Sequence, residues 1–402
     1  MAQPPRGEPA PLDGALPFAG DAQTEFSVYL HIPFCEVRCG YCDFNTYTAT
    51  ELRGVTRSSF VDDLLKEIEL SGRLLDESGT PKRKISTVFF GGGTPSLLPA
   101  VDVEKIIDTL EARFGIEDDA EVTLEANPDT VTPGLATGLR RAGVNRLSIG
   151  MQSSSPSVLK TLDRTHQPEA VQTAVAAAKS SGMQTSVDLI YGTPGETMQH
   201  WEKSLSDAIA LETDHISAYS LIVEAGTALH RKIRSGEIAD IDEDFHAEGY
   251  EVADRMLTSA GFEWYEISNW SRGSESVSRH NLAYWTGGDW WGYGPGAHSH
   301  LNGARWWNVK HPAAYAERLA AGDSPAHERE LLSAADKRIE AIMLGIRLRE
   351  GIQESLVSEE QSPEIPALIA EELIDGRKAI AGTIVLTDRG RLLADLVVRR
   401  LT

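Results

Sequence analysis

The sequence predicts an α/β fold with three parts: a parallel sheet built from six βα units, an irregular Trp-rich region and a small winged-helix-like C-terminal domain. From Phe26 onward, short apolar runs rich in β-branched residues alternate with amphipathic stretches of helical period, which is typical of βα units. Seven of the eight tryptophans lie between Trp264 and Trp307. The final segment has the pattern helix, helix, short hairpin and helix.

The six βα units can be placed residue by residue. The expected strands are Phe26–Ile32, Ser86–Phe90, Glu121–Glu125, Arg146–Gly150, Thr185–Ile190 and Ile216–Ile222. The expected helices are Arg57–Leu75, Ala100–Phe114, Pro133–Ala142, Pro156–Leu162, Pro168–Ser181 and Met198–Leu211. Thr132-Pro133 and Ser155-Pro156 each place a capping hydroxyl before a proline at the first helical position.

The regular alternation ends near Glu224, and the chain divides into four expected segments. These are a disordered tail (1–25), the βα segment (26–225), an α+β extension (226–330) and the C-terminal domain (331–402). The extension should contain a helix at Ala247–Ser259, a strand at Phe262–Ile267 and a helix within Ala313–Pro325.

The C-terminal domain is predicted from a new helical pattern that follows Leu331. An apolar stripe of helical spacing marks its first helix, which Gly351 should end. The stripe consists of Ile339, Ile342, Met343 and Ile346. A second helix at Ile365–Ile374, a hairpin wing at Ala379–Leu386 and a final helix that Thr387 caps and that ends at Val398 should follow.

Composition restricts the location and partners of the chain. The formal net charge of −22 argues against non-specific binding to nucleic acid or to an anionic membrane surface. This negative charge either serves only to keep the protein soluble or forms an acidic surface on which a partner docks. No apolar run is long enough to span a bilayer, and the Pro-, Ala- and Gly-rich segment Met1–Glu25 lacks the pattern of a signal peptide. Free thiols need a reducing compartment, so a cytoplasmic location is expected.

All three cysteines of the chain lie within eight residues, as Cys35-x3-Cys39-x2-Cys42. The odd, local set argues against a disulfide framework. A structural zinc site normally has four ligands, so zinc would need a distant His. Three thiolates on an iron–sulfur cube would leave one iron open to another ligand. Three buried core cysteines are the remaining reading.

This spacing, directly after a β-like run, resembles the signature of the radical SAM superfamily. The resemblance implies that Cys35, Cys39 and Cys42 bind a 4Fe-4S cluster whose open iron chelates S-adenosylmethionine (SAM). It also implies that the six βα units form a partial (β/α)6 barrel, with the chemistry at the C-terminal ends of the strands.

The segment Tyr29-x-His31-Ile32-Pro33-Phe34-Cys35 is similar to the anaerobic coproporphyrinogen III oxidase-like family within this superfamily. The true oxidases have a further Cys two residues beyond the third, where this chain has Phe44. This departure is similar to a haem-chaperone subfamily and argues against oxidase activity. The C-terminal segment resembles the same family, where a structural or partner-docking role is expected.

Further candidate residues lie at the predicted strand ends. Gly91-Gly92-Gly93-Thr94 would let a ligand approach the backbone, although a tight βα turn explains the glycines equally well. A buried carboxylate at Glu125 would need a partner, and Arg164 could pair with a ligand carboxylate. The resemblance implies SAM contacts at Tyr29, Tyr41, Gly92, Gly93, Thr94, Glu125, Gln152, Arg164 and Asp188.

The Trp-rich region offers a second candidate site. Histidine beside aromatic rings suits a flat iron macrocycle, but the same segment could be a lid over the barrel. The stretch His280-Asn281-x-x-Tyr284-Trp285 resembles the motif associated with haem binding in the haem-chaperone subfamily, which makes His280 the haem candidate. His298 and His300 are weaker candidates.

The resemblance, which covers Phe26 to about Leu401, leads to three functional hypotheses. The first is a haem chaperone that binds haem and a SAM-ligated cluster and transfers haem to an acceptor such as a respiratory-chain haemoprotein. Such a partner could bring weak membrane association. The second is an oxygen-independent coproporphyrinogen III oxidase. The third, a radical SAM enzyme acting on nucleic acid, is disfavoured by the acidity of the chain.

Overall fold

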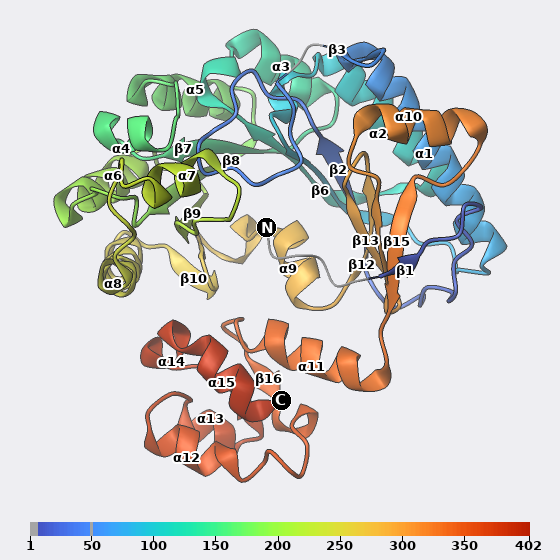
Figure 1. Ribbon diagram of the computed structural model, residues 1–402. Helices are drawn as coiled ribbons and strands as arrows, with labels where there is room; N and C mark the ends of the chain where they lie inside the picture. Colours follow the sequence, from blue (N-terminus) through green and yellow to red (C-terminus); the bar gives the residue numbers. More distant parts are fainter. Residues whose placement is uncertain (1–6, 49–50) are drawn as a thin grey trace.

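The structure, a computed structural model, describes residues 7–48 and 51–402. Its centre is a curved, 13-stranded sheet in which the six predicted strands are parallel neighbours in chain order (Figure 1). They are β2 (Phe26–Ile32), β5 (Ile85–Gly92), β6 (Ile116–Ala126), β7 (Arg146–Gln152), β8 (Gln184–Tyr191) and β9 (His215–Ser220). Among the described strands β9 pairs with β8 and β11, and not with β2, so the sheet stays open. The predicted α/β fold with a partial barrel is confirmed.

The six predicted helices all begin at the predicted residue. They are α1 (Arg57–Glu77), α2 (Ala100–Phe114), α3 (Pro133–Arg141), α4 (Pro156–Thr161), α5 (Pro168–Ser180) and α6 (Met198–Ala210). Figure 1 shows them along the outer side of the curved sheet. The apolar faces of α1, α2, α3, α5 and α6 share one buried core with the strands, because these helices cover the same outer face of the sheet, whereas Val158 of α4 belongs to a smaller, separate cluster.

The two predicted proline caps have different outcomes. The Thr132 hydroxyl accepts a hydrogen bond from the backbone N–H of Leu135 at 3.1 Å, so this cap is confirmed. The Ser155 cap is wrong: its hydroxyl pairs with the hydroxyl of Ser157 at 2.9 Å, and α4 has no side-chain cap. The last strand was also predicted too long, because β9 ends at Ser220 and Ile222 lies exposed in the loop that follows.

The segment 226–330 extends the same sheet at both of its edges. On the β9 side lie β11 (Asn269–Ser271) and β10 (Glu263–Glu266). On the other side β12 (Asp289–Tyr293) runs parallel to β2, followed by antiparallel β13 (His298–Leu301), β14 (Ala304–Asn308) and β15 (Ala326–Leu331). Most of the tryptophans therefore lie in strands, and the region is not an irregular lid.

Four helices accompany this extension. They are α7 (Ala228–Arg234), α8 (Glu243–Ser259), which begins before the predicted Ala247, α9 (Arg279–Trp285), and α10 (Pro312–Ala321), which ends before the predicted Pro325. Gly322 adopts a left-handed conformation (φ 82°) and ends α10.

The N-terminal segment was predicted to be disordered, and for residues 7–25 this is wrong. Strand β1 (Glu8–Pro9) pairs antiparallel with β15, and Glu8 forms an ion pair of 2.7 Å with Arg329. The backbone N–H of Ser324 donates to the carbonyl of Leu12 at 2.7 Å. Residues 1–6 of the predicted tail lie outside the described residues.

The C-terminal domain has its own apolar core, separate from that of the sheet. Its elements are α11 (Ala334–Gly345), β16 (Ile352–Gln353), α12 (Glu364–Ala370), α13 (Gly376–Ile380), β17 (Thr383–Ile384), α14 (Asp388–Leu392) and α15 (Ala394–Leu401). No helix in the described part of the chain is long and apolar enough to cross a bilayer.

Several predicted boundaries in this domain are wrong. Helix α11 ends at Gly345 instead of Gly351, and of its predicted stripe only Ile342 and Ile346 are buried. The wing is not a local hairpin, because β17 pairs with the distant β16 and part of the predicted hairpin is α13. The second helix ends at Ala370, and the final helix is split into α14 and α15, although Thr387 caps α14 as predicted.

The buried carboxylate of Glu67 joins α1 to the sheet extension. It accepts hydrogen bonds from the Tyr315 hydroxyl (2.5 Å), the Asn308 side-chain amide (2.7 Å) and the backbone N–H of Gly294 (2.8 Å). Burial outweighs these hydrogen bonds and raises the pKa of Glu67 to about 7.

Glu67 should make stability depend on pH. Its pKa in the folded state lies above the unfolded value, so its contribution to stability is complete below about pH 4.5 and is lost as the pH rises through 7. Between pH 5 and pH 8, the free energy of unfolding of wild type should fall by about 2–3 kcal/mol relative to Glu67→Gln in urea titrations. Glu69→Gln, at an exposed position of the same helix, is the control. Parallel pH profiles for wild type and Glu67→Gln would contradict the assignment.

Candidate functional site

A cavity of about 510 Å³ opens at the carboxyl ends of the parallel strands. Apart from Tyr29 and the three histidines His280, His298 and His300, every predicted site residue lines it. The lining predicted residues are Cys35, Cys39, Cys42, Tyr41, Gly92, Gly93, Thr94, Glu125, Gln152, Arg164 and Asp188. Side chains from distant parts of the sequence meet here because parallel strands end at the same edge of the sheet.

The three cysteines lie in the loop that follows β2, as free thiols. Cys35 is buried, and its sulfur accepts a hydrogen bond from the Thr94 hydroxyl at 3.6 Å. The sulfur of Cys39 accepts one from the Arg164 guanidinium at 3.5 Å. Burial raises the pKa of Cys35, and it raises the pKa of Cys42 to about 11.

The three thiols do not converge on one point. Within residues 7–48 and 51–402, no three His, Cys, Asp or Glu side chains are close enough together to hold a metal ion. The arrangement therefore does not match a zinc site, whose ligands meet at a single ion. A cube of four irons takes each thiolate on a different iron, so its three ligands line one end of a cavity without meeting.

At the glycine run, the cysteine loop packs against the end of β5 through backbone hydrogen bonds. The backbone N–H of Gly93 donates to the carbonyl of Ile32 at 2.7 Å, and that of Thr94 donates to Phe34 at 2.8 Å. A Cβ on Gly93 would lie 2.5 Å from the Phe34 carbonyl oxygen, and Gly92 has a φ of 105°. The run therefore allows a close approach of two backbone segments as well as a turn.

Replacing Gly93 by Ala should disturb the cysteine loop. The added Cβ meets backbone atoms that cannot rotate away, so a loss of about 1–3 kcal/mol in the free energy of unfolding is expected. Iron content after anaerobic reconstitution should fall with it. Gly134→Ala is the matched control, because the only neighbour of a Cβ at that helical position lies 3.8 Å away. Equal iron content in the two variants would refute this role of Gly93.

Two half-buried carboxylates, Glu125 on β6 and Asp188 on β8, face the cavity. Burial and the neighbouring Asp188 charge raise the pKa of Glu125 to about 8, although its Oε2 accepts a hydrogen bond from the N–H of Gly92 at 3.2 Å. Burial also raises the pKa of Asp188, whose two oxygens accept hydrogen bonds from the Ser148 hydroxyl at 3.2 and 3.0 Å. The pair offers acceptors for hydroxyl or amino groups of a bound molecule.

Arg164 supplies the positive charge of the cavity wall near the thiols. Besides Cys39, its guanidinium donates to the carbonyl of Gly150 at 2.8 Å, and its buried Nε has no hydrogen-bond partner among the described residues. Gln152, at the end of β7, has a φ of 60°, which is a strained conformation for a residue with a side chain. Strain of this kind is common at ligand sites.

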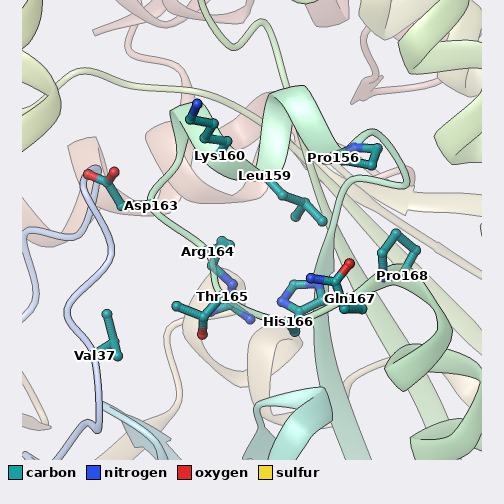
Figure 2. Close-up of a pocket in the computed structure, with 10 residues that line it drawn as sticks. All are labelled: Val37, Pro156, Leu159, Lys160, Asp163, Arg164, Thr165, His166, Gln167 and Pro168. Atoms are coloured by element: carbon teal, nitrogen blue, oxygen red, sulfur yellow. The ribbon is translucent and has the colours of Figure 1, made fainter.

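A second pocket, of about 410 Å³, adjoins the cavity and shares Arg164 and Val37 with it. Figure 2 shows Val37, on the cysteine loop, across from Arg164 and Thr165. His166 forms part of this wall, and its Nε2 hydrogen-bonds the carbonyl of Met151 at 3.1 Å. Burial lowers the pKa of His166 to about 4, so this imidazole is neutral at pH 7.

His280 does not line the cavity. It is 1% exposed on α9 and stacks on Phe89, with ring centroids 4.9 Å apart. Its Nδ1 lies 2.7 Å from the Thr87 hydroxyl and its Nε2 lies 2.8 Å from the Tyr284 hydroxyl. Burial lowers the pKa of His280 to about 3. Both nitrogens of a neutral ring are thus engaged, and neither faces open space in this conformation.

Three other aromatic residues that were predicted as site residues, Tyr29, His298 and His300, also lie outside the cavity. The hydroxyl of Tyr29 pairs with Nδ1 of His31 at 3.1 Å, beneath the glycine run. His298 is exposed and stacks on Trp307. His300 lines a different groove, where its Nδ1 bonds the carbonyl of Gly288 and its Nε2 accepts from the N–H of Gly303.

Comparison with known proteins places this geometry in a family. Residues 29–208 match the family model of the Radical SAM superfamily. The heme chaperone HemW of Mycobacterium tuberculosis is 45% identical over 98% of this chain and 99% of its own length. The chain belongs to the HemW family. The heme chaperone HemW of Bacillus subtilis is 32% identical over 92% of this chain and 97% of its own.

This chain shares its fold with a solved oxidase structure. Coproporphyrinogen III oxidase (HemN) from Escherichia coli superposes with a TM-score of 0.78 over 95% of this chain and 90% of that one. At 22% identity this likeness concerns the fold alone. It agrees with the partial barrel and with the C-terminal domain that follows it.

Phe44, the residue that separates this HemW-family chain from the oxidase pattern, lies at the cavity mouth. Its side chain is 57% exposed. Val37 and Ile222 are exposed at the same mouth, which gives it an apolar rim. The Arg38 guanidinium donates to the carbonyl of Phe44 at 3.2 Å, which fixes the loop that carries this residue.

The polar floor of the cavity was not predicted from the sequence. Alternate residues on β6, β7, β8 and β9 line it, and each of these strands contributes a small hydroxyl residue. The polar lining residues that were not predicted include Thr123, Arg146, Ser148, Ser186, His215 and Ser217. The sequence contained a signal for these residues, because polar residues occupy every second position within otherwise buried strands.

Proposed function

We propose that this HemW-family chain is a cytoplasmic haem chaperone, which binds haem as cargo beside a SAM-ligated 4Fe-4S cluster and transfers it to an acceptor protein. The observation that carries the proposal is the 45% identity to a heme chaperone along 99% of that protein's length. The relationship covers the cavity, the sheet extension and the C-terminal domain together. A respiratory-chain haemoprotein is the acceptor class that we infer.

The cavity fits the cluster and SAM by its donor set. Cys35, Cys39 and Cys42 would hold three irons, and the hydrogen bonds from Thr94 and Arg164 to sulfur would tune the reduction potential. When bound, the cluster supplies an open iron that chelates SAM and can pass it an electron. The unpartnered Nε of Arg164 supports a ligand at this wall.

The remaining lining residues suit the polar groups of SAM. The N–H groups of Gly92, Gly93 and Thr94 are already engaged, so this run would offer carbonyl oxygens to the amino group. Glu125 and Asp188 would accept hydrogen bonds from ribose hydroxyls, with Gln152 beside them. Tyr41 would pack near the adenine.

An assay for coproporphyrinogen III conversion separates this proposal from an oxidase. Protein reconstituted anaerobically is supplied with reductant, SAM and coproporphyrinogen III, and protoporphyrinogen is measured. We expect none above the level of the Cys39→Ala variant. Repeated turnover would show that the chain is an oxidase and would overturn the proposal.

A further inference from the structure

A further large cavity, separate from the two already described, lies between the sheet and the C-terminal domain. This interdomain groove has a volume of about 510 Å³, within the range of about 300–1,000 Å³ that is usual for ligand sites. Its two walls come from separate apolar cores, with α9 and the β12–β13 strands on one side and α11 on the other. Figure 1 shows α9 and α11 next to each other across the boundary between the two domains, and the two helices are in contact.

The wall of the C-terminal domain is mainly apolar. Ala341, Leu344 and Leu348 lie along α11 and its end, and Leu356 and Ile352 continue this surface. Trp285, the last residue of α9, faces the groove from the sheet side. Its ring lies close to the buried carboxylate of Glu266. The groove thus offers a flat aromatic surface opposite aliphatic side chains.

The charges in the groove favour an anionic ligand. Asp289 forms an ion pair of 2.7 Å with Arg83, and Glu340 shares the guanidinium of Arg305 with Glu330, so each lining acid has a cationic partner. Lys337 is exposed, and its hydrogen bonds among the described residues go to two oxygens of the neutral Asn302, at 2.8 and 3.4 Å. In a chain of net charge −22, this lysine is a local site of positive charge.

Helix α9 connects the groove with the cluster cavity. Ser278 and Asn281, at its beginning, line the cavity, whereas Trp285, at its end, lines the groove. His280, on the same helix, is buried in the core and lines neither space. The N-terminus of α9 is fixed by the Glu121 carboxylate, which accepts hydrogen bonds from two backbone N–H groups, Arg279 at 2.9 Å and His280 at 3.1 Å. A ligand in the groove would therefore touch the same short helix that forms part of the cavity wall.

We propose that the interdomain groove is the haem site, with the macrocycle between Trp285 and Leu344 and a propionate at Lys337. The inference rests on the proposed function, because it places the cargo of that function. A flat apolar ring with carboxylates at one edge matches an apolar slot that has one cation at its rim. In this arrangement the cluster cavity and the haem site are distinct and share α9.

Haemin titration of the reconstituted full-length protein, followed by Soret absorbance, tests the placement. Ala341→Trp fills the groove and Lys337→Glu reverses its charge, and each should weaken haemin binding about ten-fold. Ala370→Trp and Lys378→Glu, in the same domain but outside the groove, should bind haemin like wild type. Circular dichroism and thermal melting check that the variants fold.

Alkylation gives a readout that depends less on folding. A cysteine introduced by Ala341→Cys should be protected from iodoacetamide by haemin, and one introduced by Ala370→Cys should not, as measured by mass spectrometry of the two peptides. If wild type binds haemin while the groove variants bind it equally well and position 341 is not protected, the groove is not the site and the proposed function stands. If wild type shows no saturable binding, the proposed function fails, and the inference fails with it.

Discussion

Replacing Cys39 by Ala is expected to abolish the iron–sulfur cluster. The structure offers three thiols at one end of the cavity, and nowhere in the described residues are three His, Cys, Asp or Glu side chains close enough together to hold a single metal ion in their place. Two thiolates cannot retain the cube at this partly open site, so iron content should fall from about four atoms per chain to near zero. Iron analysis and the charge-transfer absorbance after anaerobic reconstitution measure the effect.

The control for this experiment lies in the same loop. Glu36 is exposed and does not line the cavity, so Glu36→Gln should load iron like wild type. Full iron content in Cys39→Ala would show that the cluster has other ligands and would contradict the site. Loss of iron in both variants would show instead that the loop is intolerant of substitution.

Replacing His280 by Ala should destabilise the protein strongly. The substitution leaves a cavity beside Phe89 and removes the partner of two hydroxyls, Thr87 and Tyr284. Both effects together should lower the free energy of unfolding by about 3–5 kcal/mol, measured by urea titration. His327→Ala, at an exposed position of β15, should have almost no effect.

His280→Gln distinguishes a structural role from a haem-ligand role. A side-chain amide can donate to one hydroxyl and accept from the other, so this variant should recover part of the stability lost in His280→Ala. Haemin binding should persist in His280→Gln if the groove holds the cargo. If His280→Ala retains its stability and loses haemin binding, then His280 ligates iron in a conformation in which its ring has left the core.

Local sequence signals predicted the βα segment well. Apolar periodicity and proline positions placed the start of each helix, and the cysteine spacing identified the loop that forms one end of the cavity. Such signals reside in a few neighbouring residues, as in Thr132-Pro133. The glycine run and Glu125 could be assigned to one site because parallel strands must end at the same edge of a sheet.

Long-range pairing could not be predicted in the same way. The segment around Glu8 has the composition of a disordered tail, but it pairs with a strand more than 300 residues away in the sequence. The wing of the C-terminal domain likewise pairs Ile352 with Ile384. These contacts depend on how the fold brings two distant strands together. The composition of either strand alone carries no information about which strand it pairs with.

The direction in which a side chain points could not be predicted from the sequence either. The residues around His280 suggested a haem ligand, yet burial and two hydroxyl partners hold its ring inside the core. Tyr29 likewise supports the glycine run from below and does not face the cavity. Ser148 and Ser186, which do face it, were overlooked because small hydroxyl residues are also common in buried strands.

The most direct test of haem carriage is a haemin titration of the reconstituted wild-type protein. We expect saturable binding of one haem per chain, seen as a shifted Soret band, and recovery of chemically unmodified haem afterwards. An absence of any saturable Soret shift at micromolar haemin would contradict the claim that this chain carries haem.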